Sequence, residues 1–372
     1  MKQRQNQNAQ APTLLQRLGA IKKTTRTDFL TYIGVTVVFL VMFVLQGQGQ
    51  LSNSLSGQLV PICCYIVMAV SLNLVVGVSG ELSLGHAGFM SVGAFTGVIA
   101  AQSLQEAIPA GGPRLLVAIL VGVIFAALAG VIVGVPVLRL RGDYLAIVTL
   151  AFGEIIKELI NCLIVGWDEN GLHIIFNISG TQSVNNLGLS ENGIAIIKGA
   201  QGATITRIST FLAGYLLIMV TLIVVLNLMR SRSGRAIMAI RDNRIAAEAT
   251  GLSVMKYKLM AFVVSAALAG GAGALYGLNF STLVSSTFDF NTSILVLVFV
   301  VLGGIGNIWG SIISAAVLTL LPELLREFDT YRMLVYAIVL ILVMLVTNNE
   351  WLRQLPERVR ERMQEKKGGA RP

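Results

Sequence analysis

The stretch RLLVAILVGVIFAALAGVIVGVPVL, residues 114–138, decides the fold class because it carries no charged residue after its first position. About twenty consecutive apolar residues let an α-helix cross the hydrocarbon core of a bilayer. Outward from this stretch, similar apolar runs recur along most of the chain. We therefore expect about ten transmembrane helices, at 29–46, 58–79, 84–103, 114–138, 144–165, 207–229, 259–280, 290–305, 308–322 and 333–347.

The composition agrees with this interpretation. Of the 372 residues, 55% are hydrophobic and only 13% are charged, whereas about a quarter of the residues in soluble domains are charged. The predicted fold is an all-α polytopic membrane protein, in which 290–322 could alternatively form one kinked span with a re-entrant piece. No segment between the apolar runs is long enough for a soluble catalytic domain.

The distribution of basic residues predicts how the chain is oriented. The net charge is +9, and nearly all Lys and Arg fall in every second loop, as the positive-inside rule requires. Both termini are then cytosolic, and the charge reflects topology, not binding to nucleic acid. The expected division is a disordered cytosolic segment 1–28, a membrane domain 29–349 with an external loop 166–206 and a cytosolic loop 230–257, and a basic cytosolic tail 350–372.

Small residues are frequent inside the predicted spans. The motifs GAFTG (Gly93–Gly97), GVIVG (Gly130–Gly134), GALYG (Gly273–Gly277) and GNIWG (Gly306–Gly310) have the spacing that lets helix backbones approach closely. We expect them to pack within the chain, with Gly303, Gly304, Gly306 and Gly310 as helix-packing residues. The three cysteines, which all lie in predicted spans, have no spacing typical of a metal site or a disulfide framework.

The stretch GVSGELSLGHAGF, residues 77–89, is unusual because polar residues and glycines stand between two apolar runs. Irregular backbone at membrane depth persists only where protein or a water-filled cavity surrounds it. The stretch is interpreted as a broken helix beside a permeation pathway; the alternative is a cytosolic turn with glycine caps. His86 is a poor candidate metal ligand because the only other histidine, His173, is placed outside. No metal site is expected.

Ionisable residues occur inside the predicted span 144–165. Glu154, Lys157 and Glu158 share one helical face, so that an internal ion pair is geometrically available. Charged groups within a span usually face the bundle interior and are functional candidates. A structural ion pair, a contact with substrate and a site for proton coupling all remain open.

The segment SGRAIMAIRDNRIAAEATG, residues 233–251, lies in the longest predicted cytosolic loop. GRAIMAIR is expected to form a short helix, after which Asp242 or Asn243 caps a second helix of about two turns. Gly251 suits the left-handed position that ends a helix. Ile245, Ala246, Ala247 and Ala249 would form a smooth face, with Arg244 and Glu248 one turn apart. This predicts a stiff projection into the cytosol, whereas an ordinary positive-inside loop is the alternative.

Other catalytic signatures are missing from the sequence. It contains no GxxxxGK[ST] phosphate-binding loop and no HExxH motif. GGIGNIWG (Gly303–Gly310) lacks the spacing of a dinucleotide-binding loop. We therefore expect a non-catalytic chain that binds no cofactor itself.

Four stretches resemble the branched-chain amino acid type of ABC-importer permeases, and most closely the LivM-type subunit. These stretches are SLNLVVGVSGELSLGHAGFMSVGAF (Ser71–Phe95), RLRGDYLAIVTLAFGEIIKELIN (Arg139–Asn161), AIRDNRIAAEATGLSVMKYKLMAF (Ala239–Phe262) and VLGGIGNIWG (Val301–Gly310). They follow the order expected for the family. Two features depart from it: Glu81 replaces an uncharged or aromatic residue, and 166–206 lacks a compact T-G-G-x-x-G pattern.

The resemblance implies a subunit of an importer in the bacterial cytoplasmic membrane. Its partners would be a homologous second permease (LivH-type), two ATP-binding subunits (LivG- and LivF-type) that hold ATP and Mg, and an external solute-binding protein. Contact with the ATPase is assigned to Arg235, Arg241, Asp242, Asn243, Arg244, Ala247, Glu248 and Gly251. The substrate pathway is assigned to Asn73, Gly80, Glu81, Ser83, Gly85, His86, Thr149, Glu154 and Asn161.

The alternatives are a proton-coupled secondary carrier that uses Glu154 or Glu81, and an ABC permease for urea or short amides. Aliphatic amino acids as cargo follow from the resemblance alone.

Overall fold

The computed structural model describes residues 14–50, 52–140, 143–168, 171–177, 184–189 and 193–325, and beyond these only 334–335, 337–338 and 341. The predicted tenth span, 333–347, and the basic tail 350–372 therefore lie essentially outside the described residues. The chain divides into two units, residues 1–51 and 52–372. The described part of the first unit is one long helix, α1 (Leu14–Gly47), with an apolar stretch at Phe29–Gly47.

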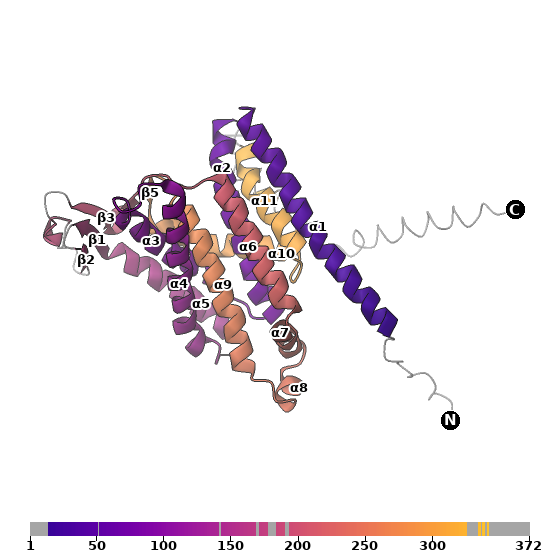
Figure 1. The fold of residues 1–372 in the computed structure, drawn as a ribbon. Helices are drawn as coiled ribbons and strands as arrows, with labels where there is room; N and C mark the ends of the chain where they lie inside the picture. The colour runs from indigo at the N-terminus through magenta and orange to yellow at the C-terminus, as the bar shows by residue number, and fades with distance from the viewer. Residues whose placement is uncertain are drawn as a thin grey trace, which may run out of the picture. The chain divides into compact units, whose positions relative to one another are not determined.

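The second unit is a helical bundle (Figure 1). Its longer helices are α2 (Asn53–Asn73), α3 (His86–Ser103), α4 (Gly111–Val137), α5 (Asp143–Asn161), α6 (Phe211–Arg230), α9 (Val254–Gly277), α10 (Phe290–Gly303) and α11 (Ile308–Leu324). Two short helices, α7 (Arg232–Asp242) and α8 (Arg244–Ala249), connect α6 to α9. A π-helix, η1 (Leu74–Ser79), continues α2.

Five helical stretches within the described residues are long and apolar enough to cross a bilayer. They are Phe29–Gly47, Asn53–Ser79, Gly111–Val137, Phe211–Arg230 and Val254–Gly277, and two shorter apolar helices, Phe290–Gly303 and Ile308–Leu324, accompany them. Helices α3 and α5 occupy two more of the predicted positions. A multi-pass membrane protein is confirmed, whereas the count of ten spans stays a prediction.

Close contacts between α3, α4 and α9 form the centre of the bundle. A Cβ atom added at Gly93 on α3 would lie 2.1 Å from the carbonyl oxygen of Gly270 on α9, and one at Gly122 on α4 would lie 2.9 Å from Ala274 Cβ. Only residues without a side chain allow such an approach. Within the predicted α4 motif, a Cβ at Gly130 would lie 2.8 Å from Ala266 Cβ on α9, so that the predicted packing of the small-residue motifs on α3, α4 and α9 is confirmed.

The predicted all-α fold describes the membrane helices but requires a correction, because the structure also contains a small sheet. Residues that were expected to end the fifth span and to form the external loop instead contribute to a five-stranded sheet in the order β2-β1-β3-β4-β5. Its strands are β1 (Leu163–Asp168), β2 (Gly171–Phe176), β3 (Ile194–Lys198), β4 (Ala203–Thr204) and β5 (Thr282–Leu283), paired antiparallel. Helix α5 ends at Asn161 because the chain turns into β1, whose Ile164, Val165 and Gly166 are buried.

The sheet and α8 lie at opposite ends of α9. Helix α9 begins shortly after α8, and its last residue, Gly277, is followed by strand β5. Figure 1 shows α9 extending from the region of β5 to the region of α8. In the second unit, one end of the bundle therefore carries the sheet and the other end carries the α7–α8 segment, defined here as residues 232–251.

Candidate functional site

Both helices of the α7–α8 segment begin at a capping side chain. Ser231 Oγ accepts a hydrogen bond of 3.0 Å from the Gly234 N–H, and Asn243 Oδ1 accepts one of 3.0 Å from the Ala246 N–H. Such caps satisfy N–H groups that have no partner inside the helix. The predicted cap at Asp242 or Asn243 is confirmed at Asn243.

Helix α8 ends in a Schellman motif. The Leu252 N–H donates to the Ala247 carbonyl at 3.1 Å, and the Gly251 N–H donates to the Glu248 carbonyl at 3.0 Å. Gly251 has a φ angle of 83°, in the left-handed region that glycine favours. The predicted role of Gly251 as the residue that ends the helix is confirmed, and the short helix is fixed at both ends.

The prediction for Ala247 requires a correction. It was expected on a face that contacts the ATPase, but it is only 5% exposed and packs in a cluster with Ile240 and Val254, against which Leu252 and Tyr257 also pack. The face that α8 presents outward is formed by Ile245, which is 80% exposed, together with the exposed Ala246 and Ala249. Ala247 therefore packs α8 against α7 and α9 of the same chain and is not part of the exposed face.

The charged side chains of the segment form local pairs. Arg244 Nε donates to Glu248 Oε1 at 2.9 Å across one turn of α8, as the spacing predicted. At the end of α7, Arg241 contacts the neighbouring Asp242 at 3.0 Å. Arg235 instead donates to the carbonyl of Arg230 at 2.7 Å. Arg241, Asp242, Arg244 and Glu248 are all partly exposed and remain accessible to a binding partner.

The stretch between α2 and α3 is irregular, as predicted. The π-helix η1 is buried throughout, Gly80 follows it with a φ angle of 74°, and residues 81–85 form no regular element before α3 begins at His86. We call residues 74–85 the irregular segment. π-Helical turns inside α-helices occur frequently at functional sites. The helix is therefore broken between α2 and α3, and a glycine stands at the turn.

Buried polar contacts hold the end of the irregular segment inside the bundle. Thr149 Oγ1 on α5 accepts a hydrogen bond of 3.1 Å from the Leu84 N–H, and a Cβ at Gly85 would lie 1.9 Å from the Thr149 carbonyl oxygen. The His86 ring lies 2.8 Å from Ser71 Oγ on α2. Ser83 Oγ is buried and has no hydrogen-bond partner among the residues that the structure describes. The predicted pathway residues Ser83, Gly85, His86 and Thr149 are therefore neighbours in one polar region.

Asn73 connects α2 to the turn between α10 and α11. Its Oδ1 accepts from the Gly306 N–H at 2.8 Å, and its Nδ2 donates to Ser311 Oγ at 2.8 Å. Gly303 and Gly310 approach backbone to backbone, as expected of packing residues. Gly304 and Gly306, with φ angles of 92° and 83°, instead lie in the turn. Both glycines thus have a conformational role, and Gly306 also packs against Gly77, where an added Cβ would lie 2.4 Å from the Gly306 nitrogen.

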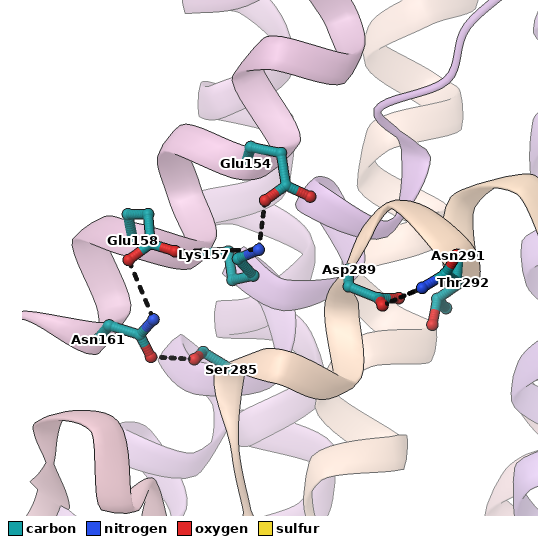
Figure 2. A network of polar contacts seen from close by, with 8 residues as sticks. All are labelled: Glu154, Lys157, Glu158, Asn161, Ser285, Asp289, Asn291 and Thr292. Atoms are coloured by element: carbon teal, nitrogen blue, oxygen red, sulfur yellow. Dashed lines mark hydrogen bonds and ion pairs between the residues drawn. The ribbon is translucent and has the colours of Figure 1, made fainter.

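A second polar network lies at the end of α5 nearest the sheet (Figure 2). Lys157 forms an ion pair with Glu154 and lies 3.8 Å from Glu158, so that the predicted pair is present, although Glu154 is partly exposed and Glu158 is exposed. Asn161 donates to Glu158 at 3.2 Å and accepts a hydrogen bond from Ser285, which lies just before α10. These contacts attach α5 to the segment that leads into α10, and they occupy Glu154, the candidate proton site.

Asp289 belongs to the same region and caps α10. Its Oδ1 accepts from the Thr292 N–H at 2.9 Å, and its Oδ2 accepts from Asn291 at 2.7 Å. Partial desolvation opposes ionisation, but the hydrogen bonds from Thr292 and Asn291 and the charge of Lys157 outweigh it and lower the pKa of Asp289. Asp289 therefore stays a carboxylate at neutral pH.

The predicted site residues thus fall into three groups. Arg235, Arg241, Asp242, Asn243, Arg244, Ala247, Glu248 and Gly251 lie in the α7–α8 segment; Asn73, Gly80, Glu81, Ser83, Gly85, His86 and Thr149 lie in or around the irregular segment; Glu154 and Asn161 lie near the sheet. Lys258 was not among the predictions, yet it forms an ion pair with Glu81. A signal was available, since Glu81 is an unexpected charge that requires a cation nearby. Among the described residues, no group of three His, Cys, Asp or Glu residues is arranged to hold a metal ion.

Comparison with known proteins places these features in a family. Residues 54–344 match the model of the branched-chain amino acid transport system permease component. The chain is 37% identical over 293 residues to the high-affinity branched-chain amino acid transport system permease protein LivM of Salmonella typhimurium strain LT2, and 36% identical over 293 residues to LivM of Escherichia coli K12. Each match covers 76% of this chain and 66% of the relative, so that the chain spans slightly less than two thirds of these proteins.

A more distant relative is a permease protein named LivH. The high-affinity branched-chain amino acid transport system permease protein LivH of Escherichia coli K12 is 27% identical over 288 residues, which cover 76% of this chain and 89% of LivH. No solved structure matches the chain.

Proposed function

Because the chain belongs to the branched-chain amino acid transport system permease family, we propose that it is the LivM-type transmembrane subunit of an ATP-driven importer of aliphatic amino acids. The importer would act in the bacterial cytoplasmic membrane. The observation that carries the proposal is α8, a helix of six residues capped at both ends whose outward face combines the exposed Ile245 with the Arg244–Glu248 pair. The exposed Ile245, Ala246 and Ala249 beside this charge pair would give a partner protein a stiff apolar surface with a polar edge.

The proposed partner at this surface is a separate ATP-binding subunit. The sequence contains no phosphate-binding loop of the GxxxxGK[ST] type, so energy from ATP has to reach the chain through protein contacts. Ile245 would enter a cleft of the partner, while Arg241, Asp242, Arg244 and Glu248 make charge-assisted contacts at its edge. ATP and Mg would be held by two such subunits, and this chain would perform no catalysis.

The mechanism follows from the need for an energy input. A bundle alone can only equilibrate its cargo, since no ligand then distinguishes an outward-facing from an inward-facing state. Closure of the two ATP-binding subunits would displace α8, and the capped helix would pass this displacement to the bundle as a rigid body. A homologous LivH-type permease and an external solute-binding protein would complete the importer, and both termini of this chain would be cytosolic.

The cargo is proposed from the family alone. Leucine, isoleucine and valine are the expected substrates, while urea and short amides are the competing ones. The proton-coupled carrier has less support, because Glu154 is engaged with Lys157 and Glu81 with Lys258.

The test is uptake of labelled leucine into proteoliposomes that contain the chain with its companion subunits and the binding protein. Uptake should require ATP and should persist when an uncoupler removes the proton gradient. Unlabelled isoleucine and valine should compete, whereas urea should not. Uptake that persists without ATP and stops with the uncoupler would contradict the proposal.

A substitution on α8 tests the contact surface. E248K places two cations one turn apart on an exposed helix, and it should abolish ATP-dependent uptake while the protein still folds. The matched control is K256E, a charge reversal at an exposed position outside α8. Normal uptake by the E248K variant would remove α8 from the mechanism.

A further inference from the structure

Two residues that flank α8, Arg241 before it and Lys258 after it, contact the same short piece of backbone. At the end of α7, Arg241 Nη1 donates a hydrogen bond of 2.8 Å to the carbonyl oxygen of Gly77. Beyond α8, Lys258 near the start of α9 forms an ion pair with Glu81. Gly77 and Glu81 both belong to the irregular segment and are one helical turn apart in sequence. The chain on both sides of α8 is thus attached to this piece.

The Lys258–Glu81 pair is largely sheltered from solvent, whereas Arg241 is partly exposed. The side chains of Lys258 and Glu81 are each 14% exposed, so that either charge would be left in a poorly hydrated place without the other. The Arg241 side chain lies along Gly80, where an added Cβ would be 2.6 Å from Arg241 Cγ. Gly80 therefore provides both the left-handed turn and the space that the arginine occupies.

The same piece of backbone continues to the interior of the bundle. A Cβ at Gly77 would lie 2.4 Å from the Gly306 backbone nitrogen, and Asn73 bonds to the same nitrogen at 2.8 Å. On the other side, the Leu84 N–H bonds to Thr149 on α5. Residues 77–81 therefore lie between the α7–α8 segment and contacts to α5 and to the α10–α11 turn.

From this arrangement we infer that Arg241, Lys258 and Glu81 are positioning residues that hold the chain on both sides of α8 against residues 77–81. Because the chain is held on both sides of α8 against the same piece of backbone, a displacement of α8 would be passed to the irregular segment. The inference rests on the proposed function, since it names the route by which movement of α8 would reach the predicted pathway.

The test measures uptake and ATP hydrolysis separately in the complete reconstituted importer. E81K and K258E should each lower the leucine taken up per ATP hydrolysed by roughly fivefold or more, the range of a moderate coupling between sites. The exchange variant E81K/K258E restores a pair of opposite charges and should recover most of the loss. K256E, which reverses an exposed charge two residues from Lys258, is the matched control and should behave as wild type.

Two further variants keep the test decisive if a charge reversal prevents assembly. E81Q removes the charge of Glu81 without bringing two cations together. R241A removes the bond to Gly77 together with a proposed contact to the ATPase, so that E81Q is the deciding variant. Both should lower uptake per ATP while hydrolysis continues, which a merely destabilised complex would not do.

The outcomes separate this inference from the proposed function. A wild-type complex without ATP-dependent uptake would overturn both. A wild-type complex that couples normally, with E81Q and K258E matching K256E, would overturn the positioning role alone. Failure of the exchange variant to recover uptake per ATP would likewise overturn the pairing of Glu81 with Lys258 as its basis.

Discussion

The side chain of Asn73 accepts a hydrogen bond of 2.8 Å from the backbone N–H of Gly306, 233 residues later in the chain. The same side chain donates to Ser311 Oγ at 2.8 Å. One buried amide therefore connects the end of α2 to the turn that separates α10 from α11. This contact holds the start of the π-helix η1 against that turn.

Replacing Asn73 by leucine should destabilise the protein. N73L keeps a similar volume but leaves the partly buried Gly306 N–H without its acceptor and the buried Ser311 without its donor, at a cost of about 1–3 kcal/mol. S311A removes only one of the two bonds and should cost less. Thermal unfolding of the purified variants in detergent measures the order, and an N73L variant that unfolds at the wild-type temperature would contradict the assignment.

Two glycines on different helices should respond in opposite ways to a methyl group. A Cβ at Gly93 would meet the backbone of Gly270 at 2.1–2.5 Å, so that G93A should cost about 1–3 kcal/mol through overpacking. Gly112, near the start of α4, has nothing within 4 Å of the same position. G112A should be neutral or stabilising by up to about 1 kcal/mol. Unfolding temperatures that are equal for both variants would refute the close α3–α9 contact.

Hydropathy predicts the helices because each long apolar run carries its own signal. The sheet has no such signal in the sequence. Strand β1 continues the apolar run of α5, so that hydropathy predicts a span that ends at residue 165, whereas the helix ends at Asn161. Strand β5 has only two residues and pairs with β4 from a distant part of the sequence. Strand pairing between remote segments depends on tertiary contacts that a single sequence does not display.

At the N-terminal cap of α8, only another hydrogen-bond acceptor should replace Asn243 without loss of stability. N243A removes the bond to the Ala246 N–H and should lower the stability of α8 by about 1 kcal/mol, while N243D retains an acceptor and should resemble wild type. Hydrogen–deuterium exchange of residues 244–251 measures the difference. Equal protection in the N243A variant would mean that packing of Ala247 alone holds the helix.

The cap of α10 should make stability depend on acid. Because the pKa of Asp289 is lowered in the folded protein, its contribution is present above the pKa of the unfolded chain and is lost as the pH falls through the folded value. D289N keeps a capping oxygen but does not titrate. The difference in unfolding temperature between wild type and D289N should therefore shrink from pH 7 to pH 3, and a constant difference would contradict the assignment.

Local geometry at the candidate site was predictable, whereas contacts between distant residues were not. Asn243, Gly251 and the Arg244–Glu248 pair follow from spacings of three to four residues, and the structure contains each of them. The inward orientation of Ala247 depends on Ile240 and Val254 closing over it. The bond from Arg241 to Gly77 and the pair of Lys258 with Glu81 join residues 164 and 177 positions apart. No periodicity within one segment indicates such partners.

The central claim is that α8 is the place where a separate ATP-binding subunit acts on this chain. A photo-activatable cross-linker introduced at the exposed Ala249 tests it directly, with the same group at the exposed Leu172 on strand β2 as control. In membranes that contain all the subunits, position 249 should cross-link to an ATP-binding subunit and position 172 should not. The claim would be contradicted if position 249 cross-linked to no ATP-binding subunit, or if position 172 did so instead.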